Sequence, residues 1–303
     1  MNLKSTQMPI ARPVLLGLLA FATMALSACE PEPVPAGDPC AQPDPGKRAL
    51  AGSYVRQQSN TPSLDLIQLA GDVRRNGRLS KLYVGEYKFD ARIDRDLKAE
   101  GIEGAFKAAR DSRAVPVDAF RDVAEGVVVY DFTYREKGKP EFNGLAVTGP
   151  PTPPSQIAKN GNAKLSGPIM LRTINLVPEE DPTPVELFGI ATISIKYGSG
   201  TGDMEVTGLG ADAPFQTVTW KGVRVCGARI VSSGQGGFQL ADDKGEPVNF
   251  AGASDDSPSG SAIFDGRFFG SSAVGTPTSV GGGVLIQGDS GLISGVFVAI
   301  PEG

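Results

Sequence analysis

Histidine is absent from all 303 residues of this chain. Its absence excludes a Ser-His-Asp triad, a Cys-His nucleophile pair, a histidine-based zinc site and a proximal histidine for haem. A Walker-type phosphate loop and a dinucleotide fingerprint after a strand are absent as well. The sequence therefore predicts a non-catalytic protein with no metal and no cofactor of its own.

Cysteine is almost as rare, and the first of only three cysteines ends a targeting segment. Lys4 and Arg12 supply positive charge, and Val14–Leu26 is an uncharged apolar run. The run has the length of a signal-peptide core and falls short of the ~18 residues that span a bilayer. It leads into Leu26-Ser27-Ala28-Cys29, the pattern of a lipobox. We expect cleavage after residue 28 and lipid on Cys29; an ordinary signal peptide followed by a chance cysteine is the alternative.

The other two cysteines, Cys40 and Cys226, would face an oxidising compartment after export, where thiols tend to pair. A disulfide between them is possible, but Cys226 could also be a buried strand thiol. Glu30 follows the lipidated position. Because aspartate there is the signal that retains lipoproteins in the inner membrane, its absence favours the outer membrane.

Residues 30–46 contain six prolines and no apolar run. Such a segment is extended and cannot pack a core, so we interpret it as a stalk. Removing residues 1–28 takes away Lys4 and Arg12 and no acidic residue, which changes the net charge from −5 to −7. This mildly acidic chain has no electrostatic footprint for nucleic acid.

Residues 47–148 have a mixed pattern. Apolar positions between Asp94 and Arg113 predict a helix, although two glycines interrupt them. Gly126–Tyr134 and Phe142–Val147 are rich in strand formers and flank a turn, so they predict a hairpin. A group of prolines at 150–154 then predicts a boundary.

Residues 155–303 show strand-like alternation at short intervals, without a helical segment of any length. In Ile190–Tyr197, for example, apolar and polar side chains alternate along the strand. Eight candidate strands follow one another: Lys164–Leu176, Val185–Tyr197, Gly202–Leu209, Thr217–Val231 (with an interruption near Gly222), Gly236–Ala241, Ser261–Phe269, Val280–Gln287 and Leu292–Ile300. Period-two strands joined by glycine-rich turns predict an antiparallel sandwich or barrel, and eight strands form a barrel that side chains can fill.

Several local patterns have both a functional and a structural interpretation. Gly288-Asp289-Ser290-Gly291 matches the tetrapeptide around a protease nucleophile, but these are also the residues of tight turns. The acidic runs Asp242–Glu246 and Asp255-Asp256 lack the ligand spacing of an EF-hand loop, so solvated loops are favoured over calcium sites.

Aromatic residues carry the same ambiguity. Tyr130, Tyr134 and Tyr197 could ligate ferric iron or haem, yet they lie in strand-like runs where aromatic residues commonly pack. Trp220 could anchor a partner, but its place in an alternating strand favours the core.

Four short motifs of the second half occur in a fixed order. They are Gly161–Gly167 (GNAKLSG), Phe264-Asp265-Gly266, Gly281-Gly282-Gly283-Val284 and Gly295-Val296-Phe297-Val298-Ala299. In this order and near the C-terminus they resemble the barrel domain of transferrin-binding protein B and related surface lipoproteins.

The resemblance implies a single lobe with a handle-like domain and a barrel. The domain organisation we expect is a signal peptide at 1–28, the lipidated cysteine and linker at 29–46, a mixed, β-rich handle-like domain at 47–154, and an eight-stranded antiparallel barrel at 155–303. The fold class is therefore mainly β. Binding residues in this family lie in variable loops, so none is transferred to this chain.

The resemblance further implies a non-catalytic lipoprotein on the outer membrane, exposed at the cell surface, that binds a host or extracellular protein or an iron- or haem-type cargo. A TonB-dependent receptor is a possible partner. We expect the specificity to lie in loops at one end of the barrel, such as Val177–Pro184 and Ala251–Gly260, and on the facing edge of residues 47–148. Loops can vary without disturbing a barrel core. A structural or envelope-assembly lipoprotein is the first alternative, and an enzyme that uses carboxylates or a Ser-Lys pair is the second.

Overall fold

The structure is a computed structural model, and it describes residues 50–58, 61–63, 69–73, 79–84, 87–90, 92–93, 104–107, 112–135, 141–175, 185–211, 213–232, 237–248, 261–270, 277–287 and 291–302. The predicted signal peptide, Cys29, Cys40 and the linker lie outside these residues. Within the described residues, no helix is long and apolar enough to cross a membrane.

The first half of the described chain is built from short antiparallel strands. Its strands are β1 (Leu50–Gln58), β2 (Thr61–Ser63), β3 (Leu69–Val73), β4 (Leu79–Val84), β5 (Tyr87–Asp90), β6 (Arg92–Ile93), β7 (Phe106–Lys107), β8 (Arg113–Pro116), β9 (Val128–Tyr134) and β10 (Glu141–Thr148). They form a seven-stranded sheet in the order β2-β1-β10-β9-β8-β7-β6 and a three-stranded sheet β3-β4-β5. The predicted hairpin is confirmed, since Phe142 pairs with Tyr134 and Val147 with Val129.

The helix predicted over Asp94–Arg113 is wrong where the structure describes it. Phe106–Lys107 forms β7, and Arg113 begins β8. The reason is visible at Gly104, whose φ of 83° lies outside the helical region and suits a turn between strands. Among the described residues the helical segments are the short 3-10 turns η1 (Asp118–Phe120) and η2 (Pro154–Gln156).

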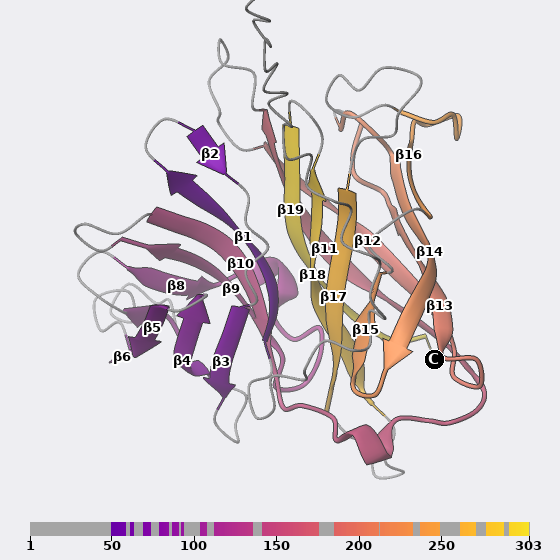
Figure 1. The fold of residues 1–303 in the computed structure, drawn as a ribbon, viewed down its shortest axis with the longest axis horizontal. Coiled ribbons are helices and arrows are strands. Elements are labelled where there is room, and N and C mark those ends of the chain that lie inside the picture. The colour runs from indigo at the N-terminus through magenta and orange to yellow at the C-terminus, as the bar shows by residue number, and fades with distance from the viewer. Residues whose placement is uncertain are drawn as a thin grey trace, which may run out of the picture. The chain divides into compact units, whose positions relative to one another are not determined.

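The second half forms a closed antiparallel barrel (Figure 1). Its strands are β11 (Asn162–Asn175), β12 (Val185–Lys196), β13 (Thr201–Thr207), β14 (Thr217–Cys226), β15 (Arg229–Val231), β16 (Phe238–Ala241), β17 (Ser261–Phe269), β18 (Ser279–Gln287) and β19 (Gly291–Pro301). Eight of these described strands follow one another as β13-β12-β11-β19-β18-β17-β15-β14, and the pairing of β13 with β14 closes the ring. The predicted eight-stranded antiparallel barrel and the mainly β fold class are confirmed.

One predicted strand differs from the structure. Thr217–Val231 is not continuous, because a turn at Gly227, with a φ of 60°, folds β15 back onto the end of β14. The interruption expected near Gly222 is real: its φ is 68°, and its N–H donates to Asp203 Oδ1 at 3.1 Å where the register of β13 and β14 shifts. The later segment β16 pairs with the first half of β14.

Alternating side chains fill the inside of the barrel. In β12 the burial alternates along the strand, with Ala191, Ile193 and Ile195 inside. Trp220 of β14 is buried in the same cluster, and its ring meets that of Phe264 edge-on at 5.7 Å. The core interpretation of Trp220 is confirmed. Because such rings and aliphatic chains pack at the density of an organic crystal, this interior is a core.

The last strand is buried on both faces, which explains its nearly continuous apolar sequence. One face looks into the barrel. On the other, Val296 and Val298 pack in a second cluster with Val129 of β9 and Leu145 and Val147 of β10. This second cluster joins the seven-stranded sheet to the outer side of the barrel, and we call it the inter-sheet core.

Three glycines of the sequence motifs are explained by packing within the barrel. Gly266 pairs with Gly282 on adjacent strands, and Gly282 pairs with Phe297 on the next. A Cβ at Gly266 would lie 3.2 Å from Phe297 Cζ, and one at Gly282 would lie 2.8 Å from Phe297 Cε1. The ring of Phe297 therefore packs directly against the backbone of β17 and β18, where glycines leave room for it. A Cβ at Gly167 of the first motif would likewise collide with the Val298 carbonyl oxygen.

Candidate functional surface

The strand order places the two loops predicted to carry specificity at the same end of the barrel. β11 ends at Asn175, which pairs with Gly291 at the start of β19. β18 ends at Gln287, which pairs with both Leu292 and Ser261. Since Val177–Pro184 follows β11 and Ala251–Gly260 precedes β17, both connect to this rim. The loops themselves lie outside the described residues.

The described connection between β13 and β14 belongs to the same rim and turns its apolar side chains inward. Leu209 and Phe215 are buried in the barrel core. Gln216 Nε2 donates to the Gly210 carbonyl at 2.7 Å and holds the connection closed on itself. The apolar side chains of this connection are therefore part of the barrel core.

Large apolar side chains are exposed beside this rim, on β12. The exposed fractions are 56% for Val185, 47% for Phe188 and 51% for Ile190. Phe188 and Ile190 alternate with buried positions and so lie on the outer face of the barrel. An exposed group of large apolar residues on an otherwise polar strand face is a mark of an interaction surface.

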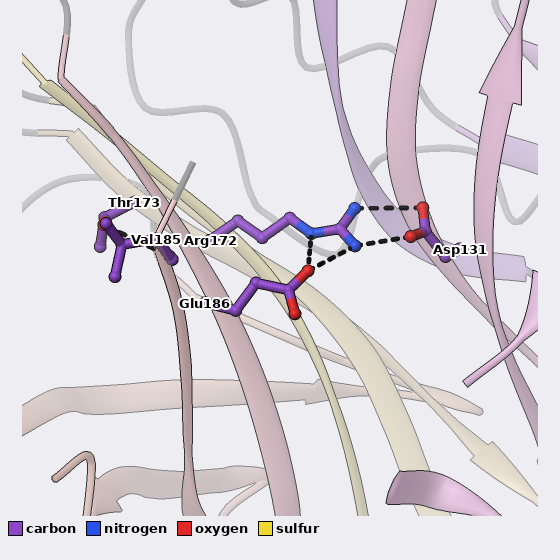
Figure 2. A network of polar contacts seen from close by, with 5 residues as sticks. All are labelled: Asp131, Arg172, Thr173, Val185 and Glu186. Carbon is purple, nitrogen blue, oxygen red and sulfur yellow. Dashed lines mark hydrogen bonds and ion pairs between the residues drawn. The ribbon is translucent and has the colours of Figure 1, made fainter. Parts of the chain in front are cut away.

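An ion-pair network connects this strand to the seven-stranded sheet (Figure 2). Arg172 of β11 donates from Nη1 and Nη2 to the two carboxylate oxygens of Asp131 on β9, at 3.1 and 2.6 Å. Its Nε and Nη2 also donate to Glu186 Oε1 on β12, at 3.0 and 2.8 Å. The rigid guanidinium fork makes four contacts to the two acids, more than the three N–H donors of a lysine could supply.

The network is half buried, and this sets its electrostatics. The Arg172 side chain is 17% exposed, against 40% for Asp131 and 45% for Glu186. Burial alone would lower the pKa of Arg172, but the hydrogen bonds and charges of Asp131 and Glu186 outweigh it, and the pKa is raised. Because the folded state raises this pKa, the stabilisation linked to it is present below the unfolded pKa and is lost as the pH rises through the folded pKa. The arginine is therefore a permanent cation between the two sheets.

Replacing Arg172 with methionine should lower the free energy of unfolding by about 1–3 kcal/mol, between the values typical of exposed and buried ion pairs. The loss is limited because both carboxylates keep access to water. Urea denaturation measures it. The matched control is Lys164→Met, which removes an exposed pair with Glu302 at 2.9 Å and should cost at most about 1 kcal/mol. Equal losses in the two variants would show that Arg172 does not couple the sheets.

The two candidate tyrosines whose side chains the structure describes lie in different parts of the fold. Tyr130 is buried in β9 of the seven-stranded sheet. Tyr197 follows β12 in the barrel half, where its ring lies 6.5 Å from that of Phe268 and burial raises its pKa. Both positions fit the packing interpretation. The side chain of Tyr134 lies outside the described residues.

Asp242–Glu246, which the sequence predicts as a solvated loop, forms a mostly exposed turn. Asp242 Oδ1 accepts the backbone N–H groups of Lys244 and Glu246, both at 2.9 Å, so this carboxylate closes a turn. Over the described part of the chain, no group of three or more Cys, Asp or Glu side chains could hold a metal ion. Asp255-Asp256 and Asp289-Ser290 fall outside that part.

Cys226 ends β14, and its sulfur is disulfide-bonded. Of the three cysteines, only this one lies within the described residues. We propose Cys40 as its partner, since Cys29 is the expected site of lipid. The bond would close a loop of roughly 185 residues, for which chain-entropy estimates give ~4–5 kcal/mol. Thiol titration of the denatured, unreduced mature protein should find no free thiol, and Cys40→Ser should expose one. Two free thiols in the unaltered protein would contradict the pairing.

No protein-family model and no curated protein matches the sequence. Solved structures similar to the chain include transferrin-binding protein B from Haemophilus parasuis, as a double mutant (TM-score 0.48, 14% identity), covering 83% of this chain and 45% of that one. The same protein from serogroup B Neisseria meningitidis gives a TM-score of 0.46 at 14% identity and covers 84% and 44% of the two chains. A structure described as a surface lipoprotein gives 0.38 at 11% identity and covers 82% and 98%. This chain thus spans less than half the length of the first two.

Proposed function

We propose that this chain is a lipid-anchored lipoprotein of the outer membrane that holds a protein partner at the cell surface. The observation that carries the proposal is the distribution of its side chains: the described barrel interior is a packed core, whereas large apolar residues lie exposed on β12 beside the loop-bearing rim. A closed barrel is a rigid scaffold because it leaves no unpaired strand edge, and its loops are free to vary.

The lipobox at Cys29 and the proline-rich linker support surface display, since they would tether the barrel to the membrane at a distance. A TonB-dependent receptor is a proposed membrane partner. A host or extracellular protein is favoured over haem or iron, because without histidine only tyrosine, methionine or carboxylates remain as ligands. The proposal assigns no catalytic residue and no cofactor.

Pull-down with loop-exchanged protein tests this function. The lipidated chain, and a variant in which Val177–Pro184 and Ala251–Gly260 are both replaced by Gly-Ser segments of equal length, are incubated with serum, with purified transferrin and with haemoproteins. We expect the native chain to retain one defined protein and the variant to lose it. Unchanged capture by the variant would refute the loop model. If nothing is retained from any fluid, the structural or envelope-assembly role becomes the better proposal.

A further inference from the structure

The outer face of the barrel carries an apolar patch that continues from a covered surface. Phe188 of β12 pairs directly with Met170 of β11, and Met170 is buried in the inter-sheet core. Ile190 pairs with Pro168 one step further along the same face. Ile300 of β19 is 38% exposed and pairs with Ser166, the next outward residue of β11. We call Phe188, Ile190 and Ile300 the β12 patch.

The patch is therefore the part of one apolar surface that the seven-stranded sheet leaves open. The covered part buries Met170, Val296 and Val298 and contributes to the cohesion of the two sheets. The open part has the same residue types on the same strands. Covering the exposed apolar side chains with a second surface would remove them from water and so lower the free energy, as it does in the covered part.

Carboxylates border the patch on two sides. Glu186 precedes Phe188 by two residues on the same face, and Glu205 of β13 is exposed and pairs with Thr192, beside Ile190. Arg172 is a single cation shared by two carboxylates, Asp131 and Glu186, so this group keeps one net negative charge, and Lys164 is paired with Glu302. Lys196, an exposed cation on the same face of β12, stands six residues beyond Ile190. The border is thus negative, which disfavours an acidic or anionic-lipid occupant.

We propose that the β12 patch docks a protein partner that presents an apolar centre flanked by lysine or arginine. The apolar centre would cover Phe188 and Ile190, and its flanking cations would meet Glu186 and Glu205. Such an arrangement places the hydrophobic contact at the middle and the charges at the rim, where they set partner choice and association rate. The proposal rests on the proposed binding function and names the chemistry of its partner.

A designed peptide tests the patch without knowledge of the natural partner. The lipidated chain is placed in neutral-lipid nanodiscs and titrated with a fluorescent peptide in which leucine alternates with serine and lysines stand at both ends. We expect saturable binding that Phe188→Ser with Ile190→Ser weakens by about tenfold or more. Lys221→Ser, an exposed change on β14, is the control and should bind like the native chain.

Three further measurements distinguish a basic protein partner from other occupants of the patch. A peptide with glutamates in place of the lysines should not bind; equal binding of both peptides would overturn the proposed charge selectivity. Loss of self-association in the serine variants, measured by sedimentation of the native and altered chains, would identify a second copy as the occupant and overturn the proposal. The loop-exchanged chain should still bind the lysine peptide, so failure at the patch and failure of the loop model give different results.

Discussion

Replacing Gly282 with valine should destabilise the barrel more than any other single change considered for the folded domain. A Cβ at this position would lie 2.6 Å from the Asp265 carbonyl oxygen, 2.7 Å from Gly266 Cα and 2.8 Å from Phe297 Cε1. The first two atoms belong to the backbone of the neighbouring strand and cannot rotate away. Overpacking typically costs 1–3 kcal/mol, and backbone contacts this close place the expected loss at about 3 kcal/mol or more.

Chemical denaturation followed by circular dichroism would measure this loss. Gly198→Val is the matched control, because its φ is not in the left-handed region and a Cβ there would have Asn160 Oδ1 at 3.8 Å as its nearest neighbour. Its effect should stay within about 0.5 kcal/mol, as for most surface changes. A Gly282→Val protein as stable as the control would mean that Phe297 does not lie across these glycines.

Replacing Cys29 with serine should block lipidation and so remove the lipid anchor. A serine hydroxyl cannot take the thioether-linked diacylglyceryl group, so the precursor should remain uncleaved or the protein should be released in soluble form. Each buried methylene contributes ~0.8 kcal/mol, and two or more acyl chains are needed for a stable anchor. Losing them removes the whole anchoring free energy in one substitution.

Metabolic labelling with a radioactive fatty acid, together with membrane fractionation, would show the result. Ser27→Ala is the control, because it keeps a small residue before the cysteine and should preserve both label and membrane attachment. The surface-display part of the proposal fails if the Cys29→Ser protein is still labelled. Partner capture by the released protein is a separate question, since the folded residues are unchanged.

Much of the barrel could be predicted from the sequence, because burial imposes a period of two on each strand. Ile190–Tyr197 shows this alternation, and the structure places Ala191, Ile193 and Ile195 inside. Thr217–Val231 was harder to divide, since Gly227 turns the chain within a run of strand formers. The helix expected over Asp94–Arg113 failed for a related reason: local periodicity favoured it, but pairing with β6 and β8 decides the conformation of Phe106–Lys107.

The role of the motif glycines and the location of the proposed β12 patch are visible only in three dimensions. Gly167, Gly266 and Gly282 suggested a family, and the structure shows that they make room for neighbouring backbone and for the ring of Phe297. Phe188 and Ile190 belong to none of the four sequence motifs, and by residue type they do not differ from the buried apolar residues of other strands.

The sequence by itself determined the absence of histidine and the alternation that makes a barrel, and it predicts the export signal with its lipobox, since each depends on residue type or on local spacing. Tertiary structure decided which apolar residues are covered. Met170 and Phe188 pair with each other, yet one is buried under the seven-stranded sheet and the other is exposed. Whether a side chain is core or surface depends on what packs over it, and Arg172, which joins Asp131 to Glu186 across two sheets, likewise depends on contacts between residues far apart in the chain.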